Sequence, residues 1–243
     1  MNVALVTGSS YGIGKAITDT LLKEGWKVYG LSRSKPPFKD EHFVWVNCDL
    51  SDQDAISKAI PHIQEPQLDA FISNAGVIEV EDASKVTDKS FQATFSVNVL
   101  APMLLVRHLR KKLETATIIS ISSVADRLPE PAIALYCSSK AANTSYFNAL
   151  AQEFKQAKVF TILPDYVETP MLHSTMDDDK SFDWSCTIKP EDIAQLSMRL
   201  IDGQVAVDSG SNIIVVTEAL KEDLKSVEKL YGYVTDSNEL IRL

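Results

Sequence analysis

Residues 3–14 of the chain read VALVTGSSYGIG. The apolar run Val3–Val6 predicts a buried strand, and Gly8, Gly12 and Gly14 follow it directly. Apolar residues then recur three and four positions apart as far as Leu21, which predicts a helix. Glycines between a strand and a helix let the backbone approach a pyrophosphate that faces the free N–H groups of the helix. The stretch therefore predicts a dinucleotide site. A tight turn without a ligand is the alternative, and a P-loop is excluded because no Lys-Ser or Lys-Thr pair follows.

The alternation of short apolar runs and helical patterns continues along the chain. Most runs are continuously apolar or β-branched, which is typical of parallel strands buried on both faces. The predicted strands are Val3–Val6, Lys27–Leu31, Phe43–Val46, Leu68–Ser73, Thr117–Ile121, Val159–Leu163 and Asn212–Val216. The predicted helices are Ile13–Leu21, Ser51 (as N-cap) to about His62, Asp88–Leu113, Ile133–Lys155 and Glu191–Ile201. Repeated β-α-β units predict an α/β fold, a doubly wound parallel sheet of seven strands with helices on both faces.

The composition excludes several classes of protein. Of the 243 residues, 45% are hydrophobic and 23% charged, which is ordinary for a soluble globular protein. The net charge of −9 repels nucleic-acid phosphates and anionic lipids, so we expect no nucleic acid and no membrane as a partner. No basic leader or apolar stretch of about 20 residues is present, and the three cysteines form no C-x-x-C pair, so we expect a cytoplasmic protein. The four histidines lack metal-ligand spacing, and we expect no metal.

Two segments do not fit the alternating pattern. Leu172–Ile188 is polar and predicts an irregular segment, either a solvated loop or a lid over a site. Glu218–Leu230 is charged and helical in pattern, which predicts a surface or interface helix. No linker divides the chain, so we expect a single NAD(P)-binding domain over residues 1–243, with a substrate loop at about 171–189 and a C-terminal tail at about 218–243.

Further motifs follow the glycine-rich turn in a fixed order. They are Cys48-Asp49-Leu50 after the third predicted strand, Asn74-Ala75-Gly76 after the fourth, Asn98 within the next helix, Ser122-Ser123 after the fifth strand, and Tyr136-Cys137-Ser138-Ser139-Lys140. Together with Thr7-Gly8-x-x-x-Gly12-x-Gly14, this set resembles the short-chain dehydrogenase/reductase family over about Val3 to Ile201. The resemblance implies a Rossmann-type sheet with strand order 3-2-1-4-5-6-7 and a cofactor across the carboxyl ends of its strands.

The resemblance assigns a catalytic set made of Asn98, Ser123, Tyr136 and Lys140. Tyr136 and Lys140 are four apart on a predicted helix, so both side chains leave the same face. A neighbouring ammonium lowers the pKa of a phenol from about 10 toward neutral pH, where general acid–base catalysis works best. Ser123 can hydrogen-bond a substrate oxygen as negative charge develops there. By the resemblance, Lys140 also holds the nicotinamide ribose and Asn98 supports a proton-relaying water. Taken alone, each residue has an ordinary structural alternative.

The resemblance also implies which residues contact the cofactor. Asp49 would contact the adenine, and Val167 and Thr169 the nicotinamide carboxamide. Asp165 stands where the family usually has a glycine, so the resemblance does not predict the backbone conformation at this position. The expected cofactor-binding residues are Gly8, Ser10, Tyr11, Gly12, Ile13, Gly14, Arg33, Asp49, Leu50, Asn74, Ala75, Gly76, Tyr136, Lys140, Val167 and Thr169.

The end of the second predicted strand bears on the choice of cofactor. An NAD site places Asp or Glu there, about 20 residues past the glycines. Here Ser32 occupies that position and Arg33 follows it. A guanidinium binds a 2′-phosphate through charge-assisted hydrogen bonds, whereas an acid would repel it. We therefore expect NADP(H) as the cofactor; a merely solvated Arg33 is the alternative.

These observations predict an NADP(H)-dependent oxidoreductase that interconverts a carbonyl and a secondary alcohol of a small-molecule substrate. A catalytically silent NADP(H)-binding sensor or scaffold is the alternative, because a fold alone does not determine function. A nucleotide-sugar epimerase is disfavoured by the glycine spacing and the lack of a sizeable C-terminal substrate domain. We expect a homodimer or homotetramer, since Asp88–Leu113 and Ile133–Lys155 resemble helices that pair in the family, with Phe147 and Phe154 on one side.

Overall fold

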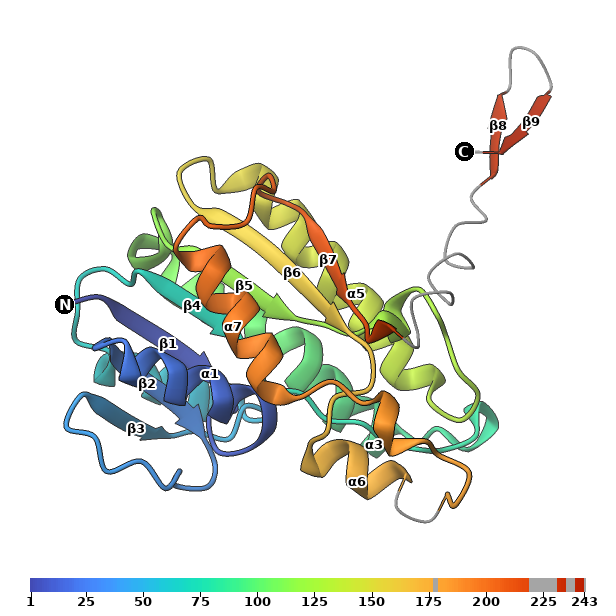
Figure 1. The fold of residues 1–243 in the computed structure, drawn as a ribbon, viewed down its shortest axis with the longest axis horizontal. Helices are drawn as coiled ribbons and strands as arrows, with labels where there is room; N and C mark the ends of the chain where they lie inside the picture. Colours follow the sequence, from blue (N-terminus) through green and yellow to red (C-terminus); the bar gives the residue numbers. More distant parts are fainter. Residues whose placement is uncertain (177–178, 219–230, 235–238, 243) are drawn as a thin grey trace.

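The computed structural model describes residues 1–176, 179–218, 231–234 and 239–242. Its centre is a parallel sheet of seven strands in the order β3-β2-β1-β4-β5-β6-β7 (Figure 1). The strands are β1 (Val3–Thr7), β2 (Lys27–Ser32), β3 (Phe43–Asn47), β4 (Ala70–Ser73), β5 (Thr117–Ile121), β6 (Lys158–Pro164) and β7 (Asn212–Val215). The predicted fold class, strand order and strand positions are confirmed.

Helices cover both faces of the sheet (Figure 1). They are α1 (Gly12–Lys23), α2 (Gln53–Ala59), α3 (Asp88–Phe95), α4 (Ala101–Leu109), α5 (Ala134–Glu153), α6 (Pro170–Met176) and α7 (Pro190–Ile201). Ala4 and Val6 of β1 pack with α1 and α7 on one face, whereas Val3 and Leu5 pack with α2, α4 and α5 on the other. This alternation along a fully buried strand explains why the runs read as continuously apolar.

The start of α2 differs from the prediction by one residue. Asp52, not Ser51, is the N-cap: its carboxylate accepts hydrogen bonds from the backbone N–H groups of Asp54 and Ala55. The Ser51 hydroxyl instead donates to Asp49 Oδ1 at 2.7 Å. A local turn around Asp49 therefore uses the hydroxyl that the prediction assigned to the helix.

The predicted single helix over residues 88–113 is broken in the middle. A π-helical turn, Ser96–Leu100, separates α3 from α4, and a 3-10 turn, Arg110–Leu113, follows α4. Pro102 lacks the N–H that would bond to the carbonyl of Asn98 in an α-helix. Asn143 Nδ2 donates to that carbonyl at 2.9 Å. The interruption thus has an identifiable cause in the sequence.

The segment predicted to be irregular contains regular structure. Residues 170–176 form α6, where Thr169 Oγ1 accepts a hydrogen bond from Leu172 N at 3.3 Å and the Leu172 side chain is buried. A 3-10 turn follows at Trp184–Cys186. The prediction of a loop is therefore wrong for residues 172–176, because a hydroxyl cap and one buried leucine outweigh the polar composition.

Two further predictions bear on the surface and the tail. Phe147 and Phe154 are 0% and 3% exposed and belong to the core beneath α5, so they are not interface residues. The predicted helix Glu218–Leu230 falls on residues 219–230, which lie outside the described residues. Beyond it, β8 (Tyr231–Val234) and β9 (Glu239–Arg242) pair as a separate antiparallel sheet that the sequence did not predict.

Candidate active site

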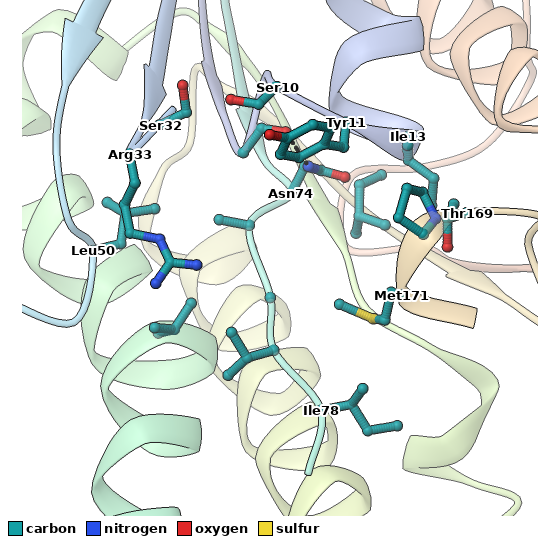
Figure 2. A pocket seen from close by; sticks show the side chains of 18 of the residues that line it. Ser10, Tyr11, Ile13, Ser32, Arg33, Leu50, Asn74, Ile78, Thr169 and Met171 are labelled. Carbon is teal, nitrogen blue, oxygen red and sulfur yellow. Dashed lines mark hydrogen bonds between the residues drawn. The ribbon is translucent and has the colours of Figure 1, made fainter. Parts of the chain in front are cut away.

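A cavity of about 660 Å³ opens at the carboxyl ends of the strands, which is within the usual size of ligand sites. It is lined by every predicted cofactor residue except Gly14 and Val167. Figure 2 shows Arg33 and Leu50 toward one end of the cavity and Ile78 and Met171 toward the other. The cavity is therefore elongated between the end of β2 and the start of α6.

The glycine-rich turn forms one wall of this cavity. Gly8 and Gly12 have φ values of +68° and +52°, a region that favours glycine. Gly14 lies behind the turn, where an added Cβ would collide with the Gly8 carbonyl oxygen. Gly14 thus allows close packing of α1 on the turn, while the backbone before it faces the cavity. This arrangement fits a pyrophosphate at the N-terminus of α1.

Thr7 and Asn74 clamp the turn to β4. Asn74 Nδ2 donates to the Thr7 carbonyl at 2.9 Å, and Thr7 Oγ1 accepts from the N–H groups of Asn74 (2.9 Å) and Ala75 (3.0 Å). The sequence prediction included Asn74 but missed Thr7, although the Thr-Gly pair at the end of a strand was a signal for it. Both residues hold the turn in place, and the Asn74 Oδ1 acceptor takes part in none of these hydrogen bonds.

Two serine hydroxyl groups hold the backbone at the end of β2 in place. Ser10 Oγ and Ser32 Oγ donate to the Ser34 carbonyl at 2.6 and 2.9 Å. Arg33, between Ser32 and Ser34 in the sequence, has an exposed side chain that lines the cavity beside Leu50 (Figure 2). Hydrogen bonds from Ser51 and then the positive charge of Arg33 hold the pKa of Asp49 below its usual value. The exposed guanidinium of Arg33 therefore lies on a wall whose backbone is held by these hydrogen bonds.

Tyr136 and Lys140 enter the cavity from one face of α5, as their spacing predicts. Lys140 Nζ lies 5.6 Å from the centroid of the Tyr136 ring and donates to the Ile121 carbonyl at 3.0 Å. Burial raises the pKa of Tyr136 to about 12, and a hydrogen bond with Ser123 acts in the opposite direction. Burial lowers the pKa of Lys140 to about 8. Desolvation is the largest cause and Lys140 is not among the groups that shift this pKa, so the predicted lowering of the Tyr136 pKa is wrong for the protein by itself.

Asn98 and Ser123 flank this pair without lining the cavity. Asn98 is 2% exposed; its Oδ1 accepts from Val77 N at 2.8 Å, and its Nδ2 donates to Val77 O and Ser139 Oγ, both at 2.9 Å. Ser123 Oγ accepts from Ala125 N at 3.2 Å, and its hydroxyl opposes the rise of the Tyr136 pKa. Asn98 therefore joins the chain after Gly76 to α5, and its role with a water stays a prediction. Two partners of Asn98 were not predicted: Ser139, which accepts from its side chain, and Asn143, which donates to its backbone carbonyl.

The end of the cavity near α6 is mainly apolar. Val77, Ile78, Pro170 and Met171 line it together with Glu79, Thr169 and Ser174. Val167 lies apart from it, buried in the core, where it pairs with Ile188. Asp165, in the place of the glycine, keeps an ordinary backbone bond from its N–H to the Val215 carbonyl at 3.0 Å. The substitution therefore leaves β6 paired with β7.

Among the described residues, no group of His, Cys, Asp or Glu side chains is placed to hold a metal ion. In the same part of the chain, no helix is both long and apolar enough to cross a membrane.

Comparisons with known proteins agree with this geometry. A family model described as short chain dehydrogenase matches residues 2–180. An uncharacterised oxidoreductase of Methylorubrum extorquens is 32% identical over 71% of this chain and 75% of its own length. Dehydrogenase/reductase SDR family member 11 of Bos taurus is 28% identical over 79% of this chain and 87% of its own. A 3-ketoacyl-(acyl-carrier-protein) reductase from Brucella melitensis, solved in complex with NADH, superposes with a TM-score of 0.80 at 25% identity, covering 88% of this chain and 96% of that one.

Proposed function

Because this chain belongs to the short-chain dehydrogenase/reductase family of oxidoreductases, we propose that it interconverts a carbonyl and a secondary alcohol with NADP(H) as cofactor. The observation that carries the proposal is the meeting of Tyr136 and Lys140 with the glycine-rich turn at one cavity. The family uses NAD(P)(H), and the glycine cradle fits a nicotinamide dinucleotide. Conversion of an alcohol to a carbonyl requires one proton acceptor and one hydride acceptor. The chain supplies the proton acceptor, which is Tyr136.

Tyr136, Ser123 and Lys140 have different roles in the proposed reaction. A bound nicotinamide would supply the hydride in reduction and take it up in oxidation. Tyr136 gives its phenolic proton to the carbonyl oxygen as the new C–H bond forms, and takes it back in the reverse direction. Ser123 donates a hydrogen bond to the same substrate oxygen as charge develops. Lys140 holds the ribose hydroxyls and stabilises the phenolate left on Tyr136.

Burial of Tyr136 leaves its phenol in the protonated form that the reduction step uses. With a pKa of about 12, the phenol carries its proton throughout the physiological range. A protonated phenol is ready to act as an acid toward a carbonyl, whereas alcohol oxidation must first remove that proton. The mainly apolar end near Ile78 and Met171 supports a substrate with an apolar body next to the reacting carbonyl.

The preference for NADP(H) is supported by the end of β2. Ser32 is 6% exposed and its hydroxyl is held by the Ser34 carbonyl, so the position at the end of β2 carries no carboxylate. Arg33 lies on the cavity wall and can reach a 2′-phosphate. The Brucella relative carries NADH in its structure. Its NADH does not carry over to this chain, where the residues at the end of β2 support the phosphorylated cofactor.

We also propose a cytoplasmic homodimer or homotetramer built on one domain, with residues 171–189 as the substrate segment. Three free thiols, Cys48, Cys137 and Cys186, support a reducing compartment. Met171 and Ser174 of α6 support the placement of the substrate segment, because both line the cavity. Light scattering at micromolar concentration tests the assembly, and a lone species of 26.8 kDa would contradict it.

The experiment that tests the function is a turnover assay. The purified protein is incubated with NADPH and a panel of apolar ketones and aldehydes, and loss of NADPH absorbance is followed. Activity that disappears in Tyr136→Phe supports the proposal. NADPH binding without turnover of any carbonyl would favour the silent binding protein instead.

A further inference from the structure

Four aromatic side chains form a row of ring contacts that ends on α6. Tyr166, just after β6, meets Phe182 edge to face with ring centroids 5.1 Å apart, and Phe182 meets Trp184 in the same way at 4.9 Å. Trp184 stacks on His173 of α6, with centroids 4.4 Å apart and an interplanar angle of 15°. Rings at these spacings attract one another beyond the area that they bury. These four residues are called the aromatic cluster below.

The aromatic cluster lies on the side of α6 that faces away from the cavity. Met171 and Ser174 line the cavity and are three positions apart, so they share one face of the helix. His173 comes two positions after Met171, which is about 200° around the helix, and its ring stacks on Trp184. Leu172 leaves α6 in a third direction and is buried. The aromatic cluster therefore supports α6 from behind, opposite Met171.

The segment that carries Phe182 and Trp184 is closed at β6. Ile188 N donates to the Tyr166 carbonyl at 2.8 Å, so the end of the segment returns to the strand from which it started. Phe182 and Trp184 are half-buried, whereas Asp183 between them is exposed. Both rings thus turn to the same side of the segment, where they contact each other and the rings of Tyr166 and His173.

The other end of the aromatic cluster is anchored on the loop that leads into α5. The Tyr166 hydroxyl donates to Glu130 Oε1 at 2.9 Å. Glu130 stands between the 3-10 turn η5 (Val124–Asp126) and α5. Because α5 carries Tyr136, the aromatic cluster connects one wall of the cavity with the chain that precedes the proposed proton donor.

We propose that Tyr166, Phe182 and Trp184 are positioning residues that hold α6 at the substrate end of the cavity. Through α6 they set the distance between Met171 and a bound carbonyl substrate. The inference rests on the proposed function, because only there is this end of the cavity assigned to the substrate. The three aromatic side chains lie outside the cavity wall, so they act on the substrate only through α6.

The direct test is the opening of α6, measured without turnover. Hydrogen exchange followed by mass spectrometry reports how often the backbone N–H groups of residues 170–176 are released. Trp184→Ala removes two ring contacts, and we expect exchange of this peptide to become about tenfold faster. Exchange of α7 should not change. An unchanged rate at α6 in Trp184→Ala would overturn the proposal.

Conservative variants separate the ring contacts from the hydrogen bond. Trp184→Phe keeps a ring that can stack on His173, and its exchange at α6 should stay within about threefold of the unmodified protein. Tyr166→Phe and Glu130→Ala each remove one partner of the same hydrogen bond, so we expect the same smaller acceleration in both and no further one in the double variant. Effects that add in the double variant would overturn the anchoring by Glu130.

A ring of another surface segment is the matched control. Phe38 is half-buried and pairs with Phe43, with centroids 4.8 Å apart. Phe38→Ala should leave exchange at α6 unchanged, and an acceleration there as large as in Trp184→Ala would overturn the proposal. If Trp184→Ala does not fold, Trp184→Leu, which keeps apolar volume without a ring, replaces it in the same measurement.

Activity gives a second and separable readout. In Trp184→Ala we expect KM for an apolar ketone to rise about tenfold, while kcat and the NADPH dissociation constant stay within about threefold, because Tyr136 and the glycine-rich turn are unchanged. Trp184→Phe should restore KM. Faster exchange at α6 with an unchanged KM would overturn the proposal and leave the aromatic cluster as structural support. If the unmodified protein reduces no carbonyl, the proposed function fails, while exchange at α6 still decides whether the aromatic cluster holds this helix.

Discussion

Asn143 Nδ2 on α5 donates a hydrogen bond to the backbone carbonyl of Asn98 at 2.9 Å. The bond ties α5, which carries Tyr136 and Lys140, to the π-helical turn between α3 and α4. Asn143 Oδ1 also accepts from Ser120 Oγ of β5 at 2.7 Å, so one side chain joins three elements behind the site. Asn143 is 6% exposed, and these bonds are therefore made away from water.

This junction predicts the effect of Asn143→Ala. The change leaves the Asn98 carbonyl and the Ser120 hydroxyl without their partner, and we expect the free energy of unfolding to fall by about 2–4 kcal/mol. Urea denaturation followed by circular dichroism measures it. Ser145→Ala on the exposed side of the same helix is the control and should change stability by less than about 0.5 kcal/mol. Equal effects of the two changes would mean that the junction does not stabilise the fold.

Removal of one hydroxyl tests the proton donor. In Tyr136→Phe we expect NADPH affinity to stay within about threefold and turnover to fall by about a hundredfold or more, the scale of a lost general acid. Tyr146→Phe removes a hydroxyl from the same helix outside the cavity and should keep its activity. Lys140→Met should weaken both binding and turnover, since Lys140 is assigned to both. Full activity in Tyr136→Phe would remove Tyr136 from the mechanism.

The pH dependence follows from the burial of Tyr136. Because its pKa is raised to about 12, the phenolate needed for alcohol oxidation is scarce at pH 7 and becomes more abundant as pH rises. We expect kcat/KM for oxidation to increase between pH 7 and 9 by up to about tenfold per pH unit. Reduction, which needs the protonated phenol, should show no such increase. Initial rates in both directions over this range decide it, and a flat oxidation profile would contradict the assignment.

We expect the preference for NADPH over NADH to depend on the guanidinium of Arg33. A charge-assisted hydrogen bond is worth about 1.5–3 kcal/mol, so we expect NADPH to bind about ten- to a hundredfold more tightly than NADH. Arg33→Ala should remove most of that preference and barely change NADH binding. Lys35→Ala, an exposed neighbour outside the cavity wall, is the matched control. Fluorescence titration gives the four dissociation constants, and equal affinities of the unmodified protein for both cofactors would exclude this role of Arg33.

A strained residue precedes the helix of Tyr136. Ala132 has φ of +62°, the single such non-glycine position in the described chain, and its carbonyl accepts from Glu81 N at 2.8 Å. The left-handed region costs a residue with a Cβ about 1–2 kcal/mol. Ala132→Gly should therefore leave the melting temperature unchanged or slightly raised. Ala149→Gly in the exposed part of α5 should lower stability by about 1 kcal/mol. If both changes destabilise equally, Ala132 is not strained.

Local patterns in the sequence were sufficient for the fold and for most of the cavity wall. Seven mainly apolar runs specified the strands, because a strand buried on both faces is apolar along most of its length. The glycine spacing specified the turn, and the four-residue spacing of Tyr136 and Lys140 placed both on one face of a helix. These features depend on neighbours within a few positions, which a sequence displays directly. The strand order came from the family resemblance.

Only the tertiary structure decided the features that depend on burial and on distant partners. The pKa values of Tyr136 and Lys140 are moved by desolvation, which no spacing of residues expresses. The carbonyl of Asn98 accepts a hydrogen bond from the side chain of Asn143, 45 positions away in the sequence. Residues 170–176 form α6 where the polar composition predicted a loop, because the side chain of Leu172 is buried. Each of these outcomes is set by packing between elements, and packing exists only once the chain has folded.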